Sequence, residues 1–236
     1  MRAFVLAAGE GSRLRPLTDA VPKPMIDVRG RPILEHNVRM LAQAGVSDIV
    51  INLHHRGETI RAHFGNGERF GVRIAYAEEP VLLGTAGALN AVRERFREPF
   101  FLIYGDNLST CRLERLLARH GRDAIATVAL FERPDVAQSG VAALDAHDRI
   151  TAFVEKPAPG TEPSHWVSAG MLVLAPAIFA FIPVSGASDI GRDVLPAAIA
   201  AGKRVEGYRM DERLWWIDSR ADYERTVADP ETALLC

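Results

Sequence analysis

The opening stretch of the chain, MRAFVLAAGEGSRLRPLTDAVPKPM, restricts its fold more than any other stretch. Residues 3–8 form an apolar run that predicts a buried strand, because the run is too short for a helix and ends at a glycine. The backbone at Gly9 and Gly11 can approach a ligand closely and turn free amide groups toward an anion. Arg13 adds a fixed positive charge with paired donors that match phosphate oxygens. A strand followed by such a loop predicts an α/β protein with a phosphate site at the strand end.

Two familiar glycine-loop motifs do not fit this stretch. A Walker loop needs a lysine and a hydroxyl residue directly after its second glycine, and neither follows Gly9 at that spacing. A dinucleotide-binding loop needs a third glycine, where this chain has Leu14, and an acidic end to the second strand, where it has His54. A phosphate loop of another kind is therefore favoured, with a tight turn carrying solvated arginines as the alternative.

Downstream of the loop, strand and helix patterns alternate. Apolar runs predict strands at residues 48–53, 72–77 and 100–104, and helical spacing of apolar residues predicts helices at 32–45, 57–64 and 84–96. The second half is less regular, with strands expected at 124–131, 141–144, 150–154, 166–174, 204–209 and 214–217 and helices at 175–181, 190–201 and 220–227. The alternation predicts mainly parallel strands flanked by helices, with ligands at the carboxyl ends of the strands.

Composition excludes several classes of protein. A chain of 236 residues with 48% apolar residues can bury a substantial core and is not a disordered chain. With a formal net charge of −2, the chain lacks the overall positive electrostatic potential that would favour binding to nucleic acid or to an anionic membrane. The sequence holds no continuous apolar run long enough for a membrane span and starts with a strand pattern rather than a signal peptide. We therefore expect a cytoplasmic protein with neither a nucleic acid nor a membrane as partner.

Short motifs recur at the expected strand ends and together form a family signature. They are LAAGEGSRL at residues 6–14, PLT at 16–18, PKPM at 22–25, GTAG at 84–87, YGDN at 104–107, VEKP at 154–157, SAG at 168–170 and WID at 216–218. In these motifs the chain resembles the sugar-1-phosphate nucleotidyltransferases, also called nucleoside-diphosphate-sugar pyrophosphorylases. The resemblance implies a Rossmann-like, GT-A-like α/β fold, with a mixed, mostly parallel sheet and a small additional β-sheet over the sugar site.

The same resemblance sets the expected domain organisation. It implies a single nucleotidyltransferase domain over residues 1–228, followed by a frayed C-terminal tail over 229–236. It also indicates the short members of the family, which lack the left-handed β-helix or isomerase domain of longer relatives. Monomer and homo-oligomer both stay open.

The resemblance also implies which residues carry the reaction. Arg13 would contact the leaving pyrophosphate, and Lys23, whose flanking prolines are expected to exclude helical backbone, would hold the attacking and transferring phosphates. Asp106 and Asp218 would share one Mg²⁺ ion with the nucleotide phosphate, since magnesium prefers oxygen ligands. The plain alternatives are a solvated arginine, a surface lysine and, for Asp218, a helix cap.

Two further sets of residues are implied as substrate contacts. The nucleotide-binding set is Leu6, Ala8, Gly9, Gly11, Glu79, Gly84, Thr85 and Ala86, and the set for the sugar phosphate is Gly105, Asn107, Glu155, Lys156, Ser168 and Gly170. In the second set the carboxylate of Glu155 would bind sugar hydroxyls and the ammonium of Lys156 the phosphate, with a surface ion pair as the alternative. Ser168 stands where relatives often carry asparagine, and Asp189 fits a ligand and a helix cap equally well.

The region around Glu79 suggests the nucleoside triphosphate. Guanine offers two adjacent N–H donors that one carboxylate can accept, whereas uracil and thymine offer one donor flanked by acceptors and suit an amide better. The Glu-Glu-Pro and Gly-Thr-Ala-Gly pattern also resembles the guanylyltransferases of mannose- or heptose-type phosphates. This resemblance implies GTP with a mannose- or manno-heptose 1-phosphate as the substrate pair. The alternatives are a uridylyl- or thymidylyltransferase acting on glucose- or N-acetylmuramic acid-type 1-phosphates, and a catalytically silent regulatory subunit that senses nucleotide sugars.

Overall fold

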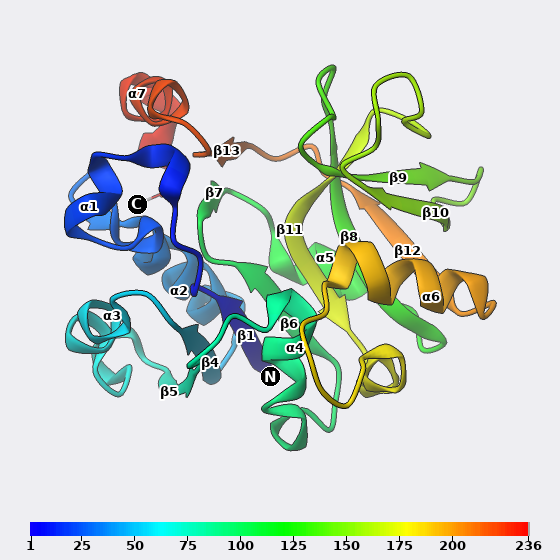
Figure 1. Ribbon diagram of the computed structural model, residues 1–236, viewed down its shortest axis with the longest axis horizontal. Coiled ribbons are helices and arrows are strands. Elements are labelled where there is room, and N and C mark those ends of the chain that lie inside the picture. Colours follow the sequence, from blue (N-terminus) through cyan, green and yellow to red (C-terminus); the bar gives the residue numbers. More distant parts are fainter. Residues whose placement is uncertain (236) are drawn as a thin grey trace. The chain divides into compact units, whose positions relative to one another are not determined.

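The computed structural model describes residues 1–235 and divides the chain into two compact units. Unit 1 contains Met1–Leu82, Ile103–Leu113 and the described part of Glu212–Cys236, and unit 2 contains Leu83–Leu102 and Glu114–Asp211. In Figure 1 the blue and cyan segments with the red C-terminal helix belong to unit 1. The chain thus leaves unit 1 and returns to it twice.

Unit 1 contains a parallel sheet in the order β1-β4-β5, in which Phe4 pairs with Val50 and Val50 with Ala75. Its strands and helices are β1 (Arg2–Leu6), α1 (Leu17–Ala20), α2 (Ile33–Gln43), β4 (Asp48–Leu53), α3 (Gly57–Phe64), β5 (Arg73–Glu78) and α7 (Arg220–Ala228). Two small antiparallel sheets complete it, formed by β2 (Asp27–Val28) with β3 (Arg31–Pro32) and by β7 (Asn107–Ser109) with β13 (Leu214–Trp216). The apolar runs are buried strands because helices cover them.

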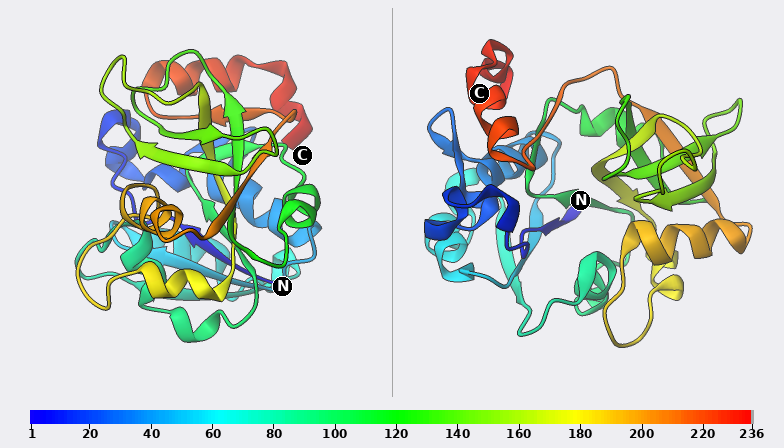
Figure 2. Two further views of the ribbon diagram at one scale, coloured as in Figure 1. Left: turned by 90° about the vertical axis from the view of Figure 1, so that its right-hand side faces the viewer. Right: turned by 45° about the horizontal axis from the view of Figure 1, so that its top comes forward.

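Unit 2 is built around the long strand β8, which pairs in parallel with β12 and in antiparallel fashion with β11. Its elements are α4 (Gly84–Asn90), β8 (Ala124–Glu132), β9 (Gly140–Leu144), β10 (Ile150–Glu155), β11 (Trp166–Leu174), α6 (Leu195–Ala200) and β12 (Arg204–Arg209). Strand β9 pairs in antiparallel fashion with β10 and touches β11 where Val141 meets Val167. Strand β6 (Phe100–Tyr104) and helix α5 (Leu113–Arg119) contain two of the four points at which the chain passes between the units. Figure 2 gives two further views of these elements.

One hydrophobic cluster of unit 1 lies under the glycine loop and the PKPM segment. Its buried members are Leu14, Ile26, Val28, Ile33, Leu108, Trp215 and Ile217. The cluster joins the start of the chain to β7 and β13, which are far away in sequence. Burial of these apolar side chains is therefore what brings the three segments of unit 1 together.

The fold class expected from the sequence is confirmed, and three of the expected helices differ in length or type. The helix expected at 84–96 ends at Asn90, whose side-chain amide donates to the carbonyls of Pro183 and Val184, and only a 3₁₀ turn follows at Arg93–Arg95. The segment expected as a helix at 175–181 is a 3₁₀ helix, Pro176–Phe181. The helix expected at 190–201 begins as a π-turn, Ile190–Val194, before α6.

The frayed tail expected after Asp229 is wrong for residues 230–235. Pro230–Leu235 forms a 3₁₀ helix in which Thr232 is fully buried. The Arg29 guanidinium donates to the Thr232 hydroxyl at 2.7 Å, and the Trp215 indole donates to the Asp229 carboxylate at 2.8 Å. These bonds attach the segment to unit 1, and Cys236 lies outside the described residues. The single domain over residues 1–228 stays a prediction.

The helices are short. The longest α-helix within residues 1–235, α2, has 11 residues, whereas a bilayer crossing needs about 20 apolar residues. In that part of the chain no helix combines the length and the apolarity of a membrane span.

Candidate functional site

The glycine loop of unit 1 is fixed by its contacts with Lys23 and Thr18. Gly11 has a φ of +63°, and a Cβ placed there would lie 2.7 Å from the Lys23 Cβ. The Thr18 hydroxyl and the Leu14 amide both donate to the Gly11 carbonyl, each at 2.9 Å. Glycine is required here for its left-handed backbone and for the close approach of Lys23.

Lys23 opens a single 3₁₀ turn, Lys23–Met25, so the expectation that the flanking prolines exclude helical backbone is wrong. The prolines are tolerated because amide groups in the first turn of a helix have no partner within that helix. The turn closes with the Met25 amide donating to the Pro22 carbonyl at 2.8 Å. A rigid turn with little backbone freedom therefore carries the lysine.

The Lys23 ammonium lies between two carboxylates. Its Nζ donates to Asp106 Oδ2 at 2.7 Å and to Asp218 Oδ1 at 3.1 Å. Burial of the lysine by itself would lower its pKa, but attraction by Asp106 and Asp218, with their hydrogen bonds, outweighs burial and raises the pKa above 10.5. Arg13 also donates to Asp218 Oδ1, at 3.2 Å. Four of the predicted residues therefore converge, two cations on two anions.

A tight glycine turn positions Asp106. The Gly105 amide donates to the Leu6 carbonyl at 2.8 Å, and a Cβ on Gly105 would lie 2.9 Å from that oxygen and 3.0 Å from Leu34 and Val5. A larger residue would push the turn away from the end of β1. Gly105 thus acts by letting the backbone approach β1 closely. Leu6 is one of the residues predicted to bind the nucleotide, and its carbonyl already accepts a hydrogen bond in this turn.

Asp218 lies between β13 and α7. Strand β13 pairs antiparallel with β7, Trp216 opposite Asn107, so the ladder carries Asp218 and Asp106 to the same end. Ser219 caps α7 by accepting from the Asp222 amide, which leaves the Asp218 carboxylate to Lys23 and Arg13. The helix-cap alternative for Asp218 is therefore wrong.

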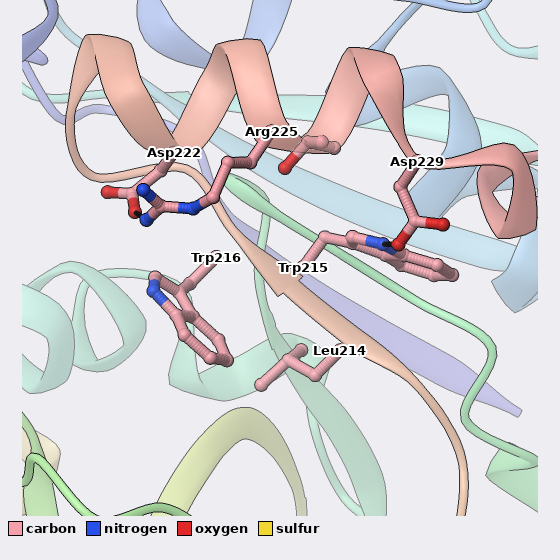
Figure 3. Close-up of a pocket in the computed structure, with 7 residues that line it drawn as sticks. Leu214, Trp215, Trp216, Asp222, Arg225 and Asp229 are labelled. Carbon is pink, nitrogen blue, oxygen red and sulfur yellow. Dashed lines mark hydrogen bonds and ion pairs between the residues drawn. The ribbon is translucent and has the colours of Figure 1, made fainter.

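A cavity of about 210 Å³ lies where β13 meets α7 (Figure 3). Figure 3 shows the Trp215 indole directed at Asp229 and the Arg225 guanidinium at Asp222. The first pair joins β13 to the residue that follows α7, and the second lies within α7, so Asp218 lies between two attached elements.

The donor set fits a magnesium ion. Asp106 and Asp218 share one cation, the Lys23 ammonium, so their oxygens already converge on a single positive charge. Among residues 1–235 no group of three or more His, Cys, Asp or Glu side chains could hold a metal. Two carboxylates fit an ion such as Mg²⁺ that retains waters and takes its other ligands from substrate phosphates.

Glu79 is buried rather than solvated, with 5% of its surface exposed. Its Oε1 accepts from Asn52 Nδ2 at 2.6 Å, and Asn52 Oδ1 accepts from the Ala7 amide at 2.6 Å. A solvated loop carboxylate, the alternative weighed for Glu79, is therefore wrong. The bonds connect Glu79 to the backbone between Leu6 and Ala8, two other residues predicted for the nucleotide.

In unit 2, Glu155 is surrounded by glycines and charges. A Cβ on Gly140 or Gly191 would lie 2.7 or 2.5 Å from Glu155 Oε2, so both glycines leave room for this carboxylate. Burial and the negative charge of Asp189 raise the pKa of Glu155 above 4.5, while Lys156 and Arg192 oppose the rise. The carboxyl group is thus half-buried and protonated more readily than a free one.

Thr85 and Ala86 direct polar groups to the segment that contains Asp189. The Thr85 hydroxyl donates to Asp189 Oδ2 at 2.8 Å and accepts from the Ile190 amide, and the Ala86 amide donates to the Ser188 carbonyl at 2.9 Å. Asp189 also caps the π-turn by accepting from the Gly191 and Arg192 amides. The cap interpretation of Asp189 is thus confirmed, and a nucleotide contact by Thr85 or Ala86 stays a prediction.

Ser168 and Gly170 lie in a β-bulge of β11. The register with β8 shifts between Ser168 and Leu172, Gly170 has a φ of +73°, and its amide donates to the Ser168 hydroxyl at 3.3 Å. Lys156 follows β10 with a φ of +51°, and its amide donates to the Ser139 carbonyl. Their contacts with a sugar phosphate stay predictions.

Two residues that were not predicted for the site, Asn52 and Arg56, support it. Asn52 is a buried polar residue among the apolar residues of β4, and such a residue needs hydrogen-bond partners. Its position in the predicted strand could therefore have identified it. Arg56 has a φ of +53° and donates to the carbonyls of Asp19 and Ala20, which steadies the segment before Lys23. Nothing in the local sequence indicates that contact.

The chain is similar to several known proteins. A family model described as nucleotidyl transferase matches residues 2–219. A UTP–glucose-1-phosphate uridylyltransferase of Synechocystis is 34% identical over 92% of the chain, and a mannose-1-phosphate guanylyltransferase of Mycobacterium tuberculosis is 34% identical over 96%. The chain spans 60% and 64% of the lengths of these two relatives.

A third relative has nearly the length of this chain. The UTP–glucose-1-phosphate uridylyltransferase AglF of Haloferax volcanii is 33% identical, and the match covers 97% of the chain and 95% of the relative. Among solved structures, a putative glucose-1-phosphate thymidylyltransferase from Bacillus anthracis superposes with a TM-score of 0.85 at 23% identity, over 97% of this chain and 94% of the other. That structure supports the fold.

Proposed function

The chain belongs to the nucleotidyl transferase family, and on that premise we propose that it joins a nucleoside triphosphate to a sugar 1-phosphate, releasing pyrophosphate. The observation that supports this most is the convergence of Lys23 with Asp106 and Asp218, beside Arg13. In the reaction a phosphate oxygen of the sugar phosphate attacks the α-phosphorus of the nucleotide, and the bond from that phosphorus to pyrophosphate breaks. Several anionic groups must therefore meet at one place.

The residues of unit 1 supply what such a reaction needs. A phosphate dianion is a competent nucleophile, so the protein has to position groups and compensate charge rather than activate a side chain. Lys23 would hold the phosphates between which the new bond forms, and Arg13, largely exposed, would bind the departing pyrophosphate. Asp106 and Asp218 would hold a magnesium ion, which supplies Lewis-acid stabilisation of phosphate charge when bound.

For the nucleotide we propose GTP, and for the sugar a mannose- or manno-heptose-type 1-phosphate. The buried carboxylate of Glu79 supports guanine, because a carboxylate can accept the adjacent ring and amino N–H groups of that base. Glu155 and Lys156 in unit 2 would bind the sugar hydroxyls and the phosphate.

A uridylyltransferase is the second candidate function, because two of the relatives described above are named UTP–glucose-1-phosphate uridylyltransferases. In that case a carboxylate at position 79 would face the carbonyl groups beside the single N–H of uracil. GTP is therefore the first choice on the chemistry of Glu79 alone.

The test is pyrophosphate release with magnesium over a grid of substrates. GTP, UTP, dTTP, CTP and ATP are each combined with mannose, glucose and manno-heptose 1-phosphates. The expected result is release with GTP and a manno-configured sugar phosphate. Release with UTP or dTTP instead would keep the reaction and overturn the choice of base.

Asp106→Asn and Asp218→Asn test the metal assignment. In both variants, half-maximal pyrophosphate release is expected to need a higher magnesium concentration than in the wild-type chain. An unchanged titration in both variants would contradict the metal assignment. Binding of nucleotide sugars without any turnover in the wild-type chain would favour the silent regulatory subunit.

A further inference from the structure

Asn52 has a polar side chain at a buried strand position that is usually occupied by an apolar residue. It lies at the end of β4, the middle strand of the β1-β4-β5 sheet, among Ile49, Val50, Ile51 and Leu53, and only 3% of its surface is exposed. Buried parallel strands are typically continuous apolar runs. A buried amide without partners destabilises the folded state, so its presence is explained only by what it binds.

The hydrogen bonds of Asn52 fix its orientation. The Ala7 amide can only donate, so the atom 2.6 Å from it must be the side-chain oxygen of Asn52. The side-chain nitrogen then faces Glu79 Oε1 at 2.6 Å and donates to it. One amide therefore joins the end of β1 to the carboxylate that follows β5, with a fixed direction of donation.

The backbone of Glu79 is held as well. Its amide donates to the Leu53 carbonyl at 2.8 Å, and its carbonyl lies 2.6 Å from His54 Nδ1. The backbone is thus fixed by Leu53 and His54, and the bond from Asn52 restrains the direction of the Glu79 side chain. The Asn52 side chain therefore bonds both Ala7 and Glu79.

We propose that Asn52 is the positioning residue that determines base selectivity, because it holds the Glu79 carboxylate as an acceptor for the N–H groups of guanine. This inference rests on the proposed function and adds to it the group that orients Glu79. Asn52 acts through Glu79 and does not itself contact the nucleotide. The Asn52 side chain also binds the backbone amide of Ala7, which holds the adjacent backbone of Leu6 and Ala8 at a fixed position relative to the Glu79 carboxylate.

The test compares kcat/KM for GTP and for UTP in Asn52→Asp. The new carboxylate still accepts from the Ala7 amide but repels Glu79 instead of donating to it. We expect kcat/KM with GTP to fall about 10- to 100-fold, the range for losing a hydrogen bond to a charged group, and the GTP-to-UTP ratio to fall at least about tenfold. The KM for the sugar phosphate should stay within about twofold of the wild-type value.

Thr127→Val is the matched control for a purely structural effect. Thr127 is a fully buried polar residue on β8 in unit 2, and its hydroxyl lies 2.9 Å from His120 Nδ1. This variant should lower the melting temperature while leaving the GTP-to-UTP ratio unchanged. An unchanged ratio in Asn52→Asp, with a lowered melting temperature as in Thr127→Val, would overturn the inference.

The double variant Asn52→Asp with Glu79→Gln separates selectivity from stability. The exchange restores a hydrogen bond, because the amide at position 79 can donate to the carboxylate at position 52. The melting temperature should therefore recover above that of Asn52→Asp, while the preference moves toward UTP, whose base suits an amide. A double variant that keeps the wild-type preference for GTP would overturn the inference.

A binding measurement without turnover keeps the inference distinct from the proposed reaction. Stabilisation of the wild-type chain by GTP over UTP, measured as a shift of melting temperature, should be lost in Asn52→Asp. If the wild-type chain releases pyrophosphate from none of the nucleotides, the proposed function is overturned. A GTP preference that survives Asn52→Asp in both assays would overturn only the role of Asn52.

Discussion

At the scale of single residues, the Lys23 ammonium balances two carboxylates that would otherwise repel each other. The Asp106 and Asp218 side chains are each 35% exposed, whereas the Lys23 side chain is 8% exposed. Water can therefore reach the carboxylates even though it hardly reaches the lysine. The charge of Lys23 can therefore be removed without leaving two buried, unsolvated carboxylates, so its effect on catalysis can be measured apart from its effect on stability.

Replacing Lys23 with Met should reduce turnover far more than stability. The methionine keeps most of the buried stem, and the two carboxylates left behind can be solvated. We expect kcat to fall by about 10²- to 10³-fold, the range for a preorganised group that stabilises developing charge, with a change of melting temperature of only a few degrees. Pyrophosphate release and thermal unfolding measure the two effects.

Lys203→Met, at an exposed lysine of unit 2, is the control for the loss of a lysine and should leave turnover unchanged. Near-normal turnover in Lys23→Met would contradict the assignment of Lys23 to the phosphates.

Glu155 should give the protein a specific dependence of stability on pH. Its pKa is raised above 4.5, mainly by burial and then by Asp189, so the folded state keeps this proton at pH values where the unfolded chain has lost it. Stability from this group is therefore present below about pH 4.5 and is lost as the pH rises through the raised pKa. Relative to Glu155→Gln, the wild-type chain should become less stable over that window and then stay at a constant difference.

Urea unfolding from pH 4 to 8 measures this difference, and Glu98→Gln, at an exposed glutamate of unit 2, should run parallel to the wild type. Parallel profiles for Glu155→Gln and the wild-type chain would contradict the assigned cause.

At the scale of elements, the glycine loop is a rigid part of unit 1 rather than a flexible flap. Leu14 lies in the buried cluster below it, and Thr18 fixes the Gly11 carbonyl from the other side. The loop and the 3₁₀ turn of Lys23 are packed against each other at Gly11. Movement of the loop would therefore move the ammonium.

Gly11→Ala should displace Lys23 and lower turnover. The left-handed backbone costs about 1–2 kcal/mol for a residue with a Cβ, and the new atom would lie 2.7 Å from the Lys23 Cβ. Gly45→Ala is the matched control, because Gly45 has a φ of +78° and open space around its Cβ position. Both variants should lose the stability that the left-handed backbone costs, Gly11→Ala should lose more because of its contact with Lys23, and only Gly11→Ala should lose kcat in the pyrophosphate assay. Equal turnover in the two variants would contradict the coupling of loop and lysine.

Elements with a strong local pattern could be predicted from the sequence. The strands Asp48–Leu53 and Phe100–Tyr104 have the expected bounds because the first is mostly apolar and the second is an apolar run that ends at Gly105. The helix expected at 84–96 was too long because a tertiary contact, from Asn90 to the segment at Pro183, decides where it ends. Spacing alone cannot show such a contact.

The candidate site divides in the same way. The resemblance selected Lys23, Asp106 and Asp218 as reaction residues, but their hydrogen bonds with one another depend on the pairing of β7 with β13. Asn52 was missed because its partners, Ala7 and Glu79, come from two other strands. The local sequence identifies residues with suitable chemistry, but the pairing of strands determines which of these side chains come into contact.

At the scale of the whole molecule, unit 1 is assembled from three separate segments of the chain. The first contributes Lys23, the second Asp106 and the third Asp218. The third segment is attached by the Trp215–Asp229 hydrogen bond and by Thr232, which is buried against Arg29. Residues that carry no reaction chemistry therefore keep Asp218 in place.

Asp229→Ala should lower both stability and turnover although Asp229 is not a site residue. The change leaves the Trp215 indole and the Glu231 amide without their acceptor. Leaving the buried Trp215 indole without an acceptor destabilises the folded state. We expect a lower melting temperature, and a lower kcat because β13 and α7 both flank Asp218.

Leu234→Ser, at a side chain that is 66% exposed, is the control and should change neither quantity. Wild-type turnover in Asp229→Ala would contradict the mechanical link to Asp218.

The ion pairs of Lys23 close very long loops of chain. The partner Asp106 is 83 residues away and Asp218 is 195 residues away. Each closure has to overcome the entropy of the intervening chain, and contacts between distant residues slow folding more than local ones do. Helices and neighbouring strands can therefore form long before the ammonium meets both carboxylates. During refolding from denaturant, recovery of pyrophosphate release should lag behind recovery of the far-ultraviolet circular dichroism, so that catalysis reports the last step of folding.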